Sequence, residues 1–144
     1  MYDKKKNCVL QQGSHAPVDL TAVAVQTFSH VLFANMRVTR LMARVTTAIV
    51  STGAVELAYR RRPSYNSATG QSTLGTLSIP AGAAAGDVYY SDIDPVDCNL
   101  GDQVVVSVTA AAAGGGAAGQ ALCDFEADLD SEFASNQSNM IESA

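Results

Sequence analysis

The chain of 144 residues has no tryptophan, two histidines and three cysteines. His15 and His30 belong to no motif that combines a nucleophile, a base and a third orienting group. The sequence also contains no GxSxG, HExxH or P-loop pattern. We therefore expect no enzyme activity, no catalytic residue and no cofactor.

The cysteines Cys8, Cys98 and Cys123 lie far apart and form no CxxC pair. Their spacing matches no metal site, and the aspartates between Asp92 and Asp102 lack the regular ligand repeat of a calcium loop. We expect no metal and interpret the cysteines as reduced apolar residues. A Cys98–Cys123 disulfide stays open, because each residue lies in or beside an expected strand.

Long apolar runs are also missing. No run reaches the roughly 18 residues that a membrane-spanning helix needs, and the residues after Lys6 lack the apolar region of a secretory signal. We therefore expect no membrane partner. The length suits one domain. Aromatic residues make up 6% and charged residues 16% of the chain, so small and β-branched side chains should build the core.

Basic residues are absent after Arg62. Up to Arg62 the chain has nine basic and three acidic residues, a net charge of +6, and beyond it eleven acidic residues give −11. A nucleic-acid-binding domain is normally basic, so we expect no nucleic-acid partner. Two interpretations stay open: the halves interleave and their charges pair, or a basic arm and an acidic tail each meet a complementary neighbour.

Short alternating segments separated by Gly, Pro, Asn and Asp are present instead, and they are typical of an antiparallel β-sandwich. Along the first of these strands, one face carries Arg40 and Arg44, and the other carries Leu41, Ala43, Val45, Thr47 and Ile49. Ser51-Thr52-Gly53 should join it to the second strand as a hairpin. The expected strands are residues 38–50, 55–60, 73–79, 87–91, 103–109 and 120–127.

Residues 18–34 are ambiguous between helix and strand, because their apolar residues fit both periods; strands are favoured by the β-rich sequence that follows. The predicted organisation is an N-terminal arm (1–18), a sandwich (19–127) and an acidic tail (128–144). Leu129 and Phe133, four residues apart, would share one face of a short helix in the tail. The predicted core residues are Leu41, Val45, Ile49, Leu57, Leu77, Ile79, Val104, Val106, Val108 and Phe125.

The run from Leu57 to Ala111 contains a strand ending in basic residues, a SATG loop and a strand ending in Ile-Pro. A Gly/Ala loop then leads into a VYY strand, and a PVxxNxGD turn precedes a valine-rich strand. Over about residues 37–127 this pattern resembles small virion proteins of tailed bacteriophages. The resemblance implies a β-sandwich of jelly-roll type that decorates or cements the outer surface of the assembled head.

By the same resemblance, the partners are the major capsid protein and neighbouring copies of this chain, as a homo-oligomer on the particle. The protein would be made in the host cytoplasm and reside on the capsid surface. Other virion parts (a head-fibre base, a neck or tail component, a receptor-binding module) and a carbohydrate-binding sandwich stay open. The candidate contact residues are Lys4, Lys5, Lys6, Arg40, Arg44, Arg60, Arg61, Arg62, Leu129 and Phe133.

Overall fold

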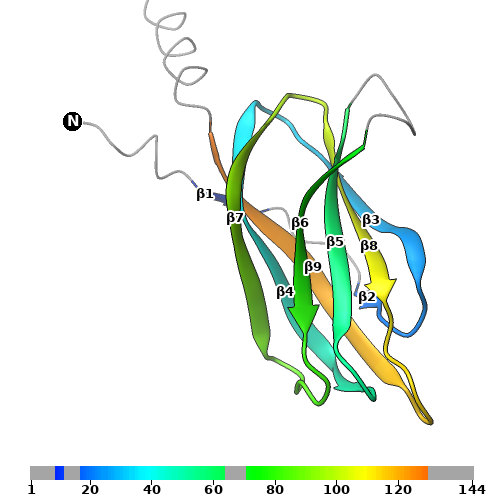
Figure 1. The fold of residues 1–144 in the computed structure, drawn as a ribbon. Coiled ribbons are helices and arrows are strands. Elements are labelled where there is room, and N and C mark those ends of the chain that lie inside the picture. Colours follow the sequence, from blue (N-terminus) through cyan, green and yellow to red (C-terminus); the bar gives the residue numbers. More distant parts are fainter. Residues whose placement is uncertain (1–8, 12–16, 64–70, 130–144) are drawn as a thin grey trace, which may run out of the picture.

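The computed structural model describes residues 9–11, 17–63 and 71–129. These residues form strands and connecting turns without any helix, which confirms the predicted all-β class (Figure 1). The strands are β1 (Val9–Gln11), β2 (Val18–Asp19), β3 (Ala24–Val31), β4 (Met36–Val50), β5 (Val55–Arg62), β6 (Ser72–Ile79), β7 (Val88–Cys98), β8 (Gln103–Ala110) and β9 (Ala118–Leu129).

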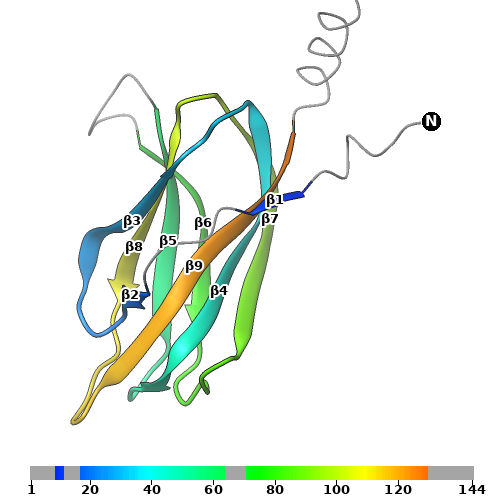
Figure 2. The same ribbon diagram turned by 180° about the vertical axis from the view of Figure 1, so that it is seen from behind.

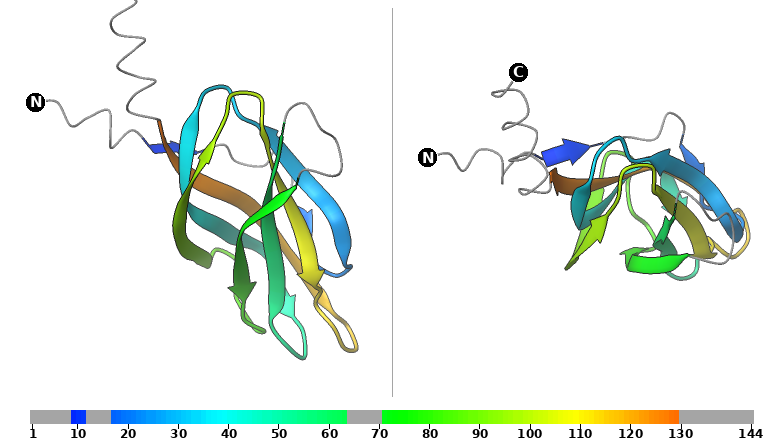
Figure 3. Two further views of the ribbon diagram at one scale, coloured as in Figure 1. Left: turned by 45° about the horizontal axis from the view of Figure 1, so that its top comes forward. Right: turned by 90° about the horizontal axis from the view of Figure 1, so that it is seen from above.

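Two antiparallel sheets pack face to face (Figures 1 and 2). Sheet A has the order β1-β9-β4-β7, with β2 also paired to β9, and sheet B has the order β3-β8-β5-β6. The view from above shows the two layers and the loops that link strands of one sheet to strands of the other (Figure 3). The predicted antiparallel β-sandwich is therefore confirmed.

The strand pairing is nested. β2 pairs with β9, β3 with β8, β4 with β7 and β5 with β6. The predicted hairpin of residues 38–60 is wrong, because β4 belongs to sheet A and β5 to sheet B. Both strands have one apolar face, and these faces meet across the core instead of lying side by side in one sheet. Alternation identifies the buried face of a strand but not its hydrogen-bonded neighbour.

The interior between the sheets holds all ten predicted core residues, each at most 3% exposed. Thr47 was expected on the same face and is exposed instead. The register between β4 and β9 shifts on both sides of Thr47, and such bulges interrupt the alternation locally. Strand β8 is buried on both faces, since Val105 and Ser107 are as inaccessible as their inward neighbours.

Strand β7 extends well beyond the predicted residues 87–91 and reaches Cys98. Asp94 and Pro95 are residue types typical of turns, yet here they continue the strand. Proline is tolerated there because β7 is an edge strand whose free side needs no ladder hydrogen bond. Asp92 and Asp97 are held by ion pairs to arginines of β4.

The ambiguous segment 18–34 contains β2 and β3, which answers the helix-or-strand question in favour of strands. The pairing of β3 with β8 is irregular between Ala24 and Phe28. Such a shift interrupts the strict alternation of apolar and polar residues along a strand. The ends of the sandwich also differ from the expected boundaries. β1 lies within the segment expected to be an arm, and β9 continues through Leu129.

Gly75 of β6 lies where the edges of the two sheets approach each other. A Cβ at this position would be 2.6 Å from Ile93 Cγ2 and 3.1 Å from Leu41 Cδ1. We expect Gly75→Ala to lower the free energy of unfolding by about 1–3 kcal/mol, because the branched Ile93 side chain cannot move without disturbing the core. Urea denaturation would measure the change.

Gly53→Ala is the matched control for Gly75→Ala. Gly53 lies in the β4–β5 turn, and a Cβ there would have no atom within 4 Å. The control should change stability little or increase it slightly, because alanine restricts the unfolded chain. Equal effects of the two substitutions would show that β6 and β7 do not approach as described.

Candidate functional site

One end of the sandwich differs chemically from the other. The upper end, at the top of Figure 1, contains the β3–β4 turn (32–35), the end of β5 (60–62), the β7–β8 turn (99–102) and the end of β9 (128–129). At the opposite end, the turns of residues 51–54, 80–87 and 111–117 consist largely of alanine, glycine and other small residues, whereas the β2–β3 turn (20–23) contains the buried Leu20 and the exposed Val23. The upper end therefore combines exposed apolar side chains with the arginines that end β5 and with Asp102, whereas three turns of the opposite end are built from small residues.

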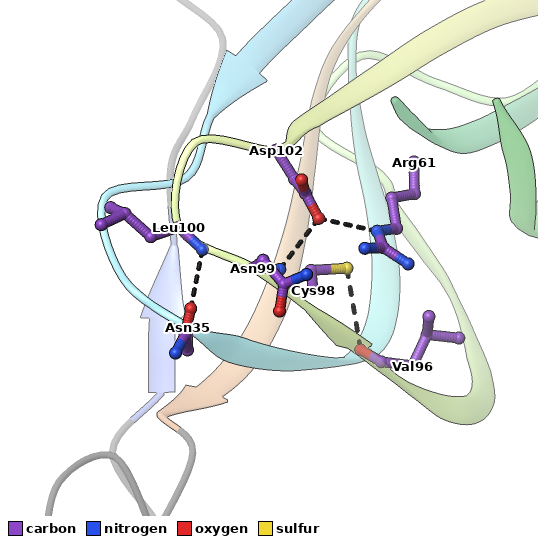
Figure 4. Close-up of polar contacts among 7 residues, drawn as sticks. All are labelled: Asn35, Arg61, Val96, Cys98, Asn99, Leu100 and Asp102. Carbon is purple, nitrogen blue, oxygen red and sulfur yellow. Dashed lines mark hydrogen bonds and ion pairs between the residues drawn. The ribbon is translucent and has the colours of Figure 1, made fainter. Parts of the chain in front are cut away.

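Hydrogen bonds tie the two turns of the upper end together. Leu32 N–H donates to the Asp102 carbonyl at 2.8 Å, and Gly101 N–H donates to the Leu32 carbonyl at 2.9 Å. Leu100 N–H donates to Asn35 Oδ1 at 2.8 Å (Figure 4). Gly101 has φ +89°, a conformation that glycine adopts without strain and that the Asn-Leu-Gly-Asp turn requires. The turns therefore form one hydrogen-bonded unit.

This unit presents two large apolar side chains to solvent. Phe33 is 60% exposed and lies between the buried Leu32 and Ala34, while Leu100 is 58% exposed at the corner of its turn. Leu32 forms backbone hydrogen bonds with Gly101 and Asp102, so Phe33 and Leu100 each lie next to a residue of this hydrogen-bonded backbone. We call Phe33 and Leu100 the apolar tip.

A buried ion pair anchors the β7–β8 turn from below. Arg61 Nε lies 2.7 Å from Asp102 Oδ2, and the two side chains are 26% and 3% exposed. The same carboxylate oxygen accepts a hydrogen bond from Asn99 N–H at 2.9 Å (Figure 4). Asp102 thus connects β5 to the turn that carries Leu100.

The buried Cys98 lies close to this ion pair, and its Sγ donates to the Val96 carbonyl at 3.8 Å. Burial raises the pKa of the Cys98 thiol to about 11, although Arg61 acts in the opposite direction. Burial likewise raises the pKa of Cys123 to about 12. Both cysteines are free, which confirms the predicted reduced state for these two residues. The Cys98–Cys123 disulfide that the sequence left as an alternative is not formed. Cys8 lies outside the described residues.

Two further arginines on the outer face of sheet A are paired. Arg40 Nε lies 2.7 Å from Asp92 Oδ1, its Nη1 lies 3.7 Å from Glu126, and its guanidinium covers the Tyr90 ring at 4.8 Å. The hydrogen bond to Asp92 raises the pKa of Arg40. Arg37 Nε lies 2.8 Å from Asp97 Oδ1.

These ion pairs, like that of Arg61, each join a basic residue up to Arg62 with an acidic residue beyond it. The interpretation that the two halves of the chain interleave and partly neutralise each other is confirmed for the described residues. The alternative, a basic arm and an acidic tail that bind neighbours, concerns residues that lie mostly outside the described part.

The other candidate contact residues have varied positions. Arg44 is exposed, in a row with Val88 and Leu122 of the flanking strands. Arg60 and Arg62 flank Arg61 and are partly exposed. The remaining candidates lie outside the described residues, and these are Lys4, Lys5, Lys6 and Phe133.

Leu129 belongs to β9 and packs against the hydrophobic core. The prediction that it shares one face of a short helix with Phe133 is therefore wrong at Leu129, because pairing with β4 extends the sheet through this residue.

The apolar tip was not predicted from the sequence. A leucine at the centre of the turn Asn99–Asp102 was the available signal, since such turns otherwise contain polar residues and glycine. Phe33 gave no comparable signal, because it belongs to a continuous apolar run that resembles a buried strand.

Across residues 9–11, 17–63 and 71–129, no group of three or more His, Cys, Asp or Glu side chains is arranged to hold a metal ion. The same residues contain no helix of the length and hydropathy needed to cross a membrane.

No family model matches the chain, and no curated protein matches it. Among solved structures, the chain is similar to the Eiger TNF from S. frugiperda, with 11% sequence identity, a TM-score of 0.47 and coverage of 85% of each chain.

Proposed function

We propose that the protein is a structural component of a tailed-phage virion that binds the outer surface of the capsid and stabilises contacts between capsomers. Its partners are the major capsid protein and neighbouring copies of itself on the particle. The sequence pattern of strand ends and turns between Leu57 and Ala111 supports this assignment. The role needs binding surfaces and mechanical stability, and we assign it no catalytic step.

We also infer that the sandwich is of jelly-roll type. The nested pairs β2–β9, β3–β8, β4–β7 and β5–β6 support this, because a jelly roll arises when a folded-over pair of chain segments wraps into two sheets. This architecture occurs in viral capsid proteins and also in lectins. It therefore agrees with the proposal without identifying the function.

The position of the chain ends is the observation that carries the proposal. Val9 of β1 pairs with Asp128 of β9, so the segments before Val9 and after Leu129 join the sandwich at adjacent points of the upper end. One segment contains Lys4–Lys6, and the other contains Asp130 and Glu132. Charged terminal segments that begin at one place, next to an exposed apolar tip, fit a protein that attaches by this end.

Co-sedimentation with undecorated heads, assembled from the capsid protein of the same phage, tests the proposal. The full chain should pellet with the heads. Removal of residues 1–8 and 130–144, with β1 and β9 retained, should weaken binding about tenfold or more while leaving the urea denaturation midpoint nearly unchanged. Salt should weaken binding by the full chain more than by the truncated protein, because exposed charges are screened beyond about 8 Å at physiological ionic strength.

Failure of the full chain to bind such heads would contradict the proposed function. Gel filtration adds an independent measurement, since a stable trimer in solution would favour the base of a head fibre. Undiminished binding by the truncated protein would place the whole contact on the sandwich.

A further inference from the structure

We propose that Lys4–Lys6 is a site of limited proteolysis, at which a protease of trypsin specificity removes the basic segment and leaves the sandwich folded. Proteases of this class cleave after lysine or arginine, because their specificity pocket binds a positively charged side chain. The cut itself does not depend on the proposed function. Its consequence for attachment to heads does, because that proposal assigns binding to the charged terminal segments.

The positions of the basic residues carry the inference. Every lysine of the chain lies in Lys4–Lys6, which precedes β1. Three arginines belong to β4 and three to β5, and these are Arg37, Arg40, Arg44, Arg60, Arg61 and Arg62. Folded proteins are usually cut at the tips of exposed loops. The stretches that connect the strands from β1 to β9 contain neither lysine nor arginine.

Both strands that contain arginine are interior strands of their sheets. β4 lies between β9 and β7, and β5 lies between β8 and β6. Arg40, for example, is paired with Asp92 of β7 on one side and with Glu126 of β9 on the other. A protease can bind an extended segment only through backbone groups that are free to form hydrogen bonds. The backbone of an interior strand is already paired on both edges, so its bonds can be cleaved only after the strand leaves the sheet.

Arg62 is the arginine with the least backbone pairing. It pairs with Gln103 of β8, whereas the register with β6 ends one residue earlier, at Arg61 and Ser72. Pro63 follows Arg62 directly. Proline has no backbone N–H and restricts the residue before it, so the bond that precedes it is resistant to trypsin. At this position the chemistry of the bond replaces the protection that a second neighbouring strand gives to the other arginines.

The lysines have different sequence surroundings. Asp3, the three lysines and Asn7 form five successive polar residues, and lysine side chains are almost never fully buried. A cut after Lys6 leaves β1 complete, because this strand begins at Val9. The remaining chain has six basic and thirteen acidic residues, instead of nine and fourteen. The protease would therefore remove positive charge without removing any of the strands.

Limited trypsin digestion of the purified full chain, followed by mass spectrometry, tests the proposal. In the native protein we expect cuts within Lys4–Lys6 and one stable product that keeps the urea denaturation midpoint of the intact chain. Cleavage after the arginines should be at least about a thousandfold slower, because it requires opening of a sheet that is closed almost all the time. In urea above the denaturation midpoint, the arginine bonds other than Arg62–Pro63 should be cut readily.

Two lysine substitutions separate exposure of a side chain from pairing of its backbone, with a lysine-specific protease as the probe. Gly115 lies in the β8–β9 turn and is exposed, and a Cβ there would have no atom within 4 Å. Arg44 is also exposed, but its backbone pairs with Val88 on one side and Leu122 on the other. We expect the native Gly115→Lys variant to be cut in the turn, and the Arg44→Lys variant to be cut in β4 only when unfolded.

Cleavage of native Arg44→Lys as fast as Gly115→Lys would overturn the protection that we assign to interior strands. A native digest that leaves Lys4–Lys6 uncut, or that unfolds the sandwich by cutting there, would overturn the site itself. These digests contain no heads, so their outcome is independent of the proposed function. If the cut product binds undecorated heads as tightly as the full chain does, the role of the basic segment in attachment is overturned and the proteolytic site stands.

Discussion

Replacement of Val106 by aspartate is expected to leave no folded protein. Val106 lies in β8 at the centre of sheet B, between β3 and Tyr59 of β5, and is completely buried. An unpaired carboxylate there must lose its hydration or take up a proton, and either event costs several kcal/mol. Because a domain of this size is stable by only about 5–15 kcal/mol, we expect insoluble expression or no cooperative unfolding transition.

Two further variants make this expectation quantitative. Val106→Thr keeps the shape of the side chain but buries a hydroxyl, and should lower the free energy of unfolding by about 1–3 kcal/mol. Val50→Asp, at a valine that is 49% exposed at the end of β4, should change it by no more than about 0.5 kcal/mol. A soluble Val106→Asp variant with the same denaturation midpoint as Val50→Asp would show that the side chain at position 106 reaches solvent in the folded protein.

The core could be predicted because burial leaves a local record in the sequence. Two apolar residues of β6, Leu77 and Ile79, alternate with polar residues, and both are buried. In β8, valines recur at every second position, and these are also buried: Val104, Val106 and Val108. The partners of the strands left no such record. Whether β4 pairs with β5 or with β9 depends on how the chain closes over the core, and that is a property of distant segments.

The charge pattern gave a similar partial prediction. Separation of the basic and acidic halves left interleaving as one of two interpretations, and it could not show which arginine meets which aspartate. Arg61 reaches Asp102 only because β5 and β8 are neighbours in sheet B. The apolar tip was harder still, since Phe33 and Leu100 are 67 positions apart and are brought together by hydrogen bonds between two turns.

The Arg61–Asp102 ion pair should be the most important polar interaction of the upper end for stability. Asp102→Ala leaves the guanidinium of Arg61 without the carboxylate that compensates it, and it also removes the acceptor for Asn99 N–H. Loss of one partner from a buried pair typically costs about 3–5 kcal/mol. We expect a decrease of that size in the free energy of unfolding, measured by urea denaturation.

Asp97→Ala is the matched control for Asp102→Ala, because the Arg37–Asp97 pair has a similar length but side chains that are 53% and 70% exposed. Solvent screens such a pair, so its loss should cost at most about 1 kcal/mol. The double variant Arg61→Leu with Asp102→Ala should recover part of the loss, because no uncompensated charge stays buried. If Asp102→Ala and Asp97→Ala prove equally mild, Asp102 is accessible to water in solution, and the support that we assign to the apolar tip is lost with it.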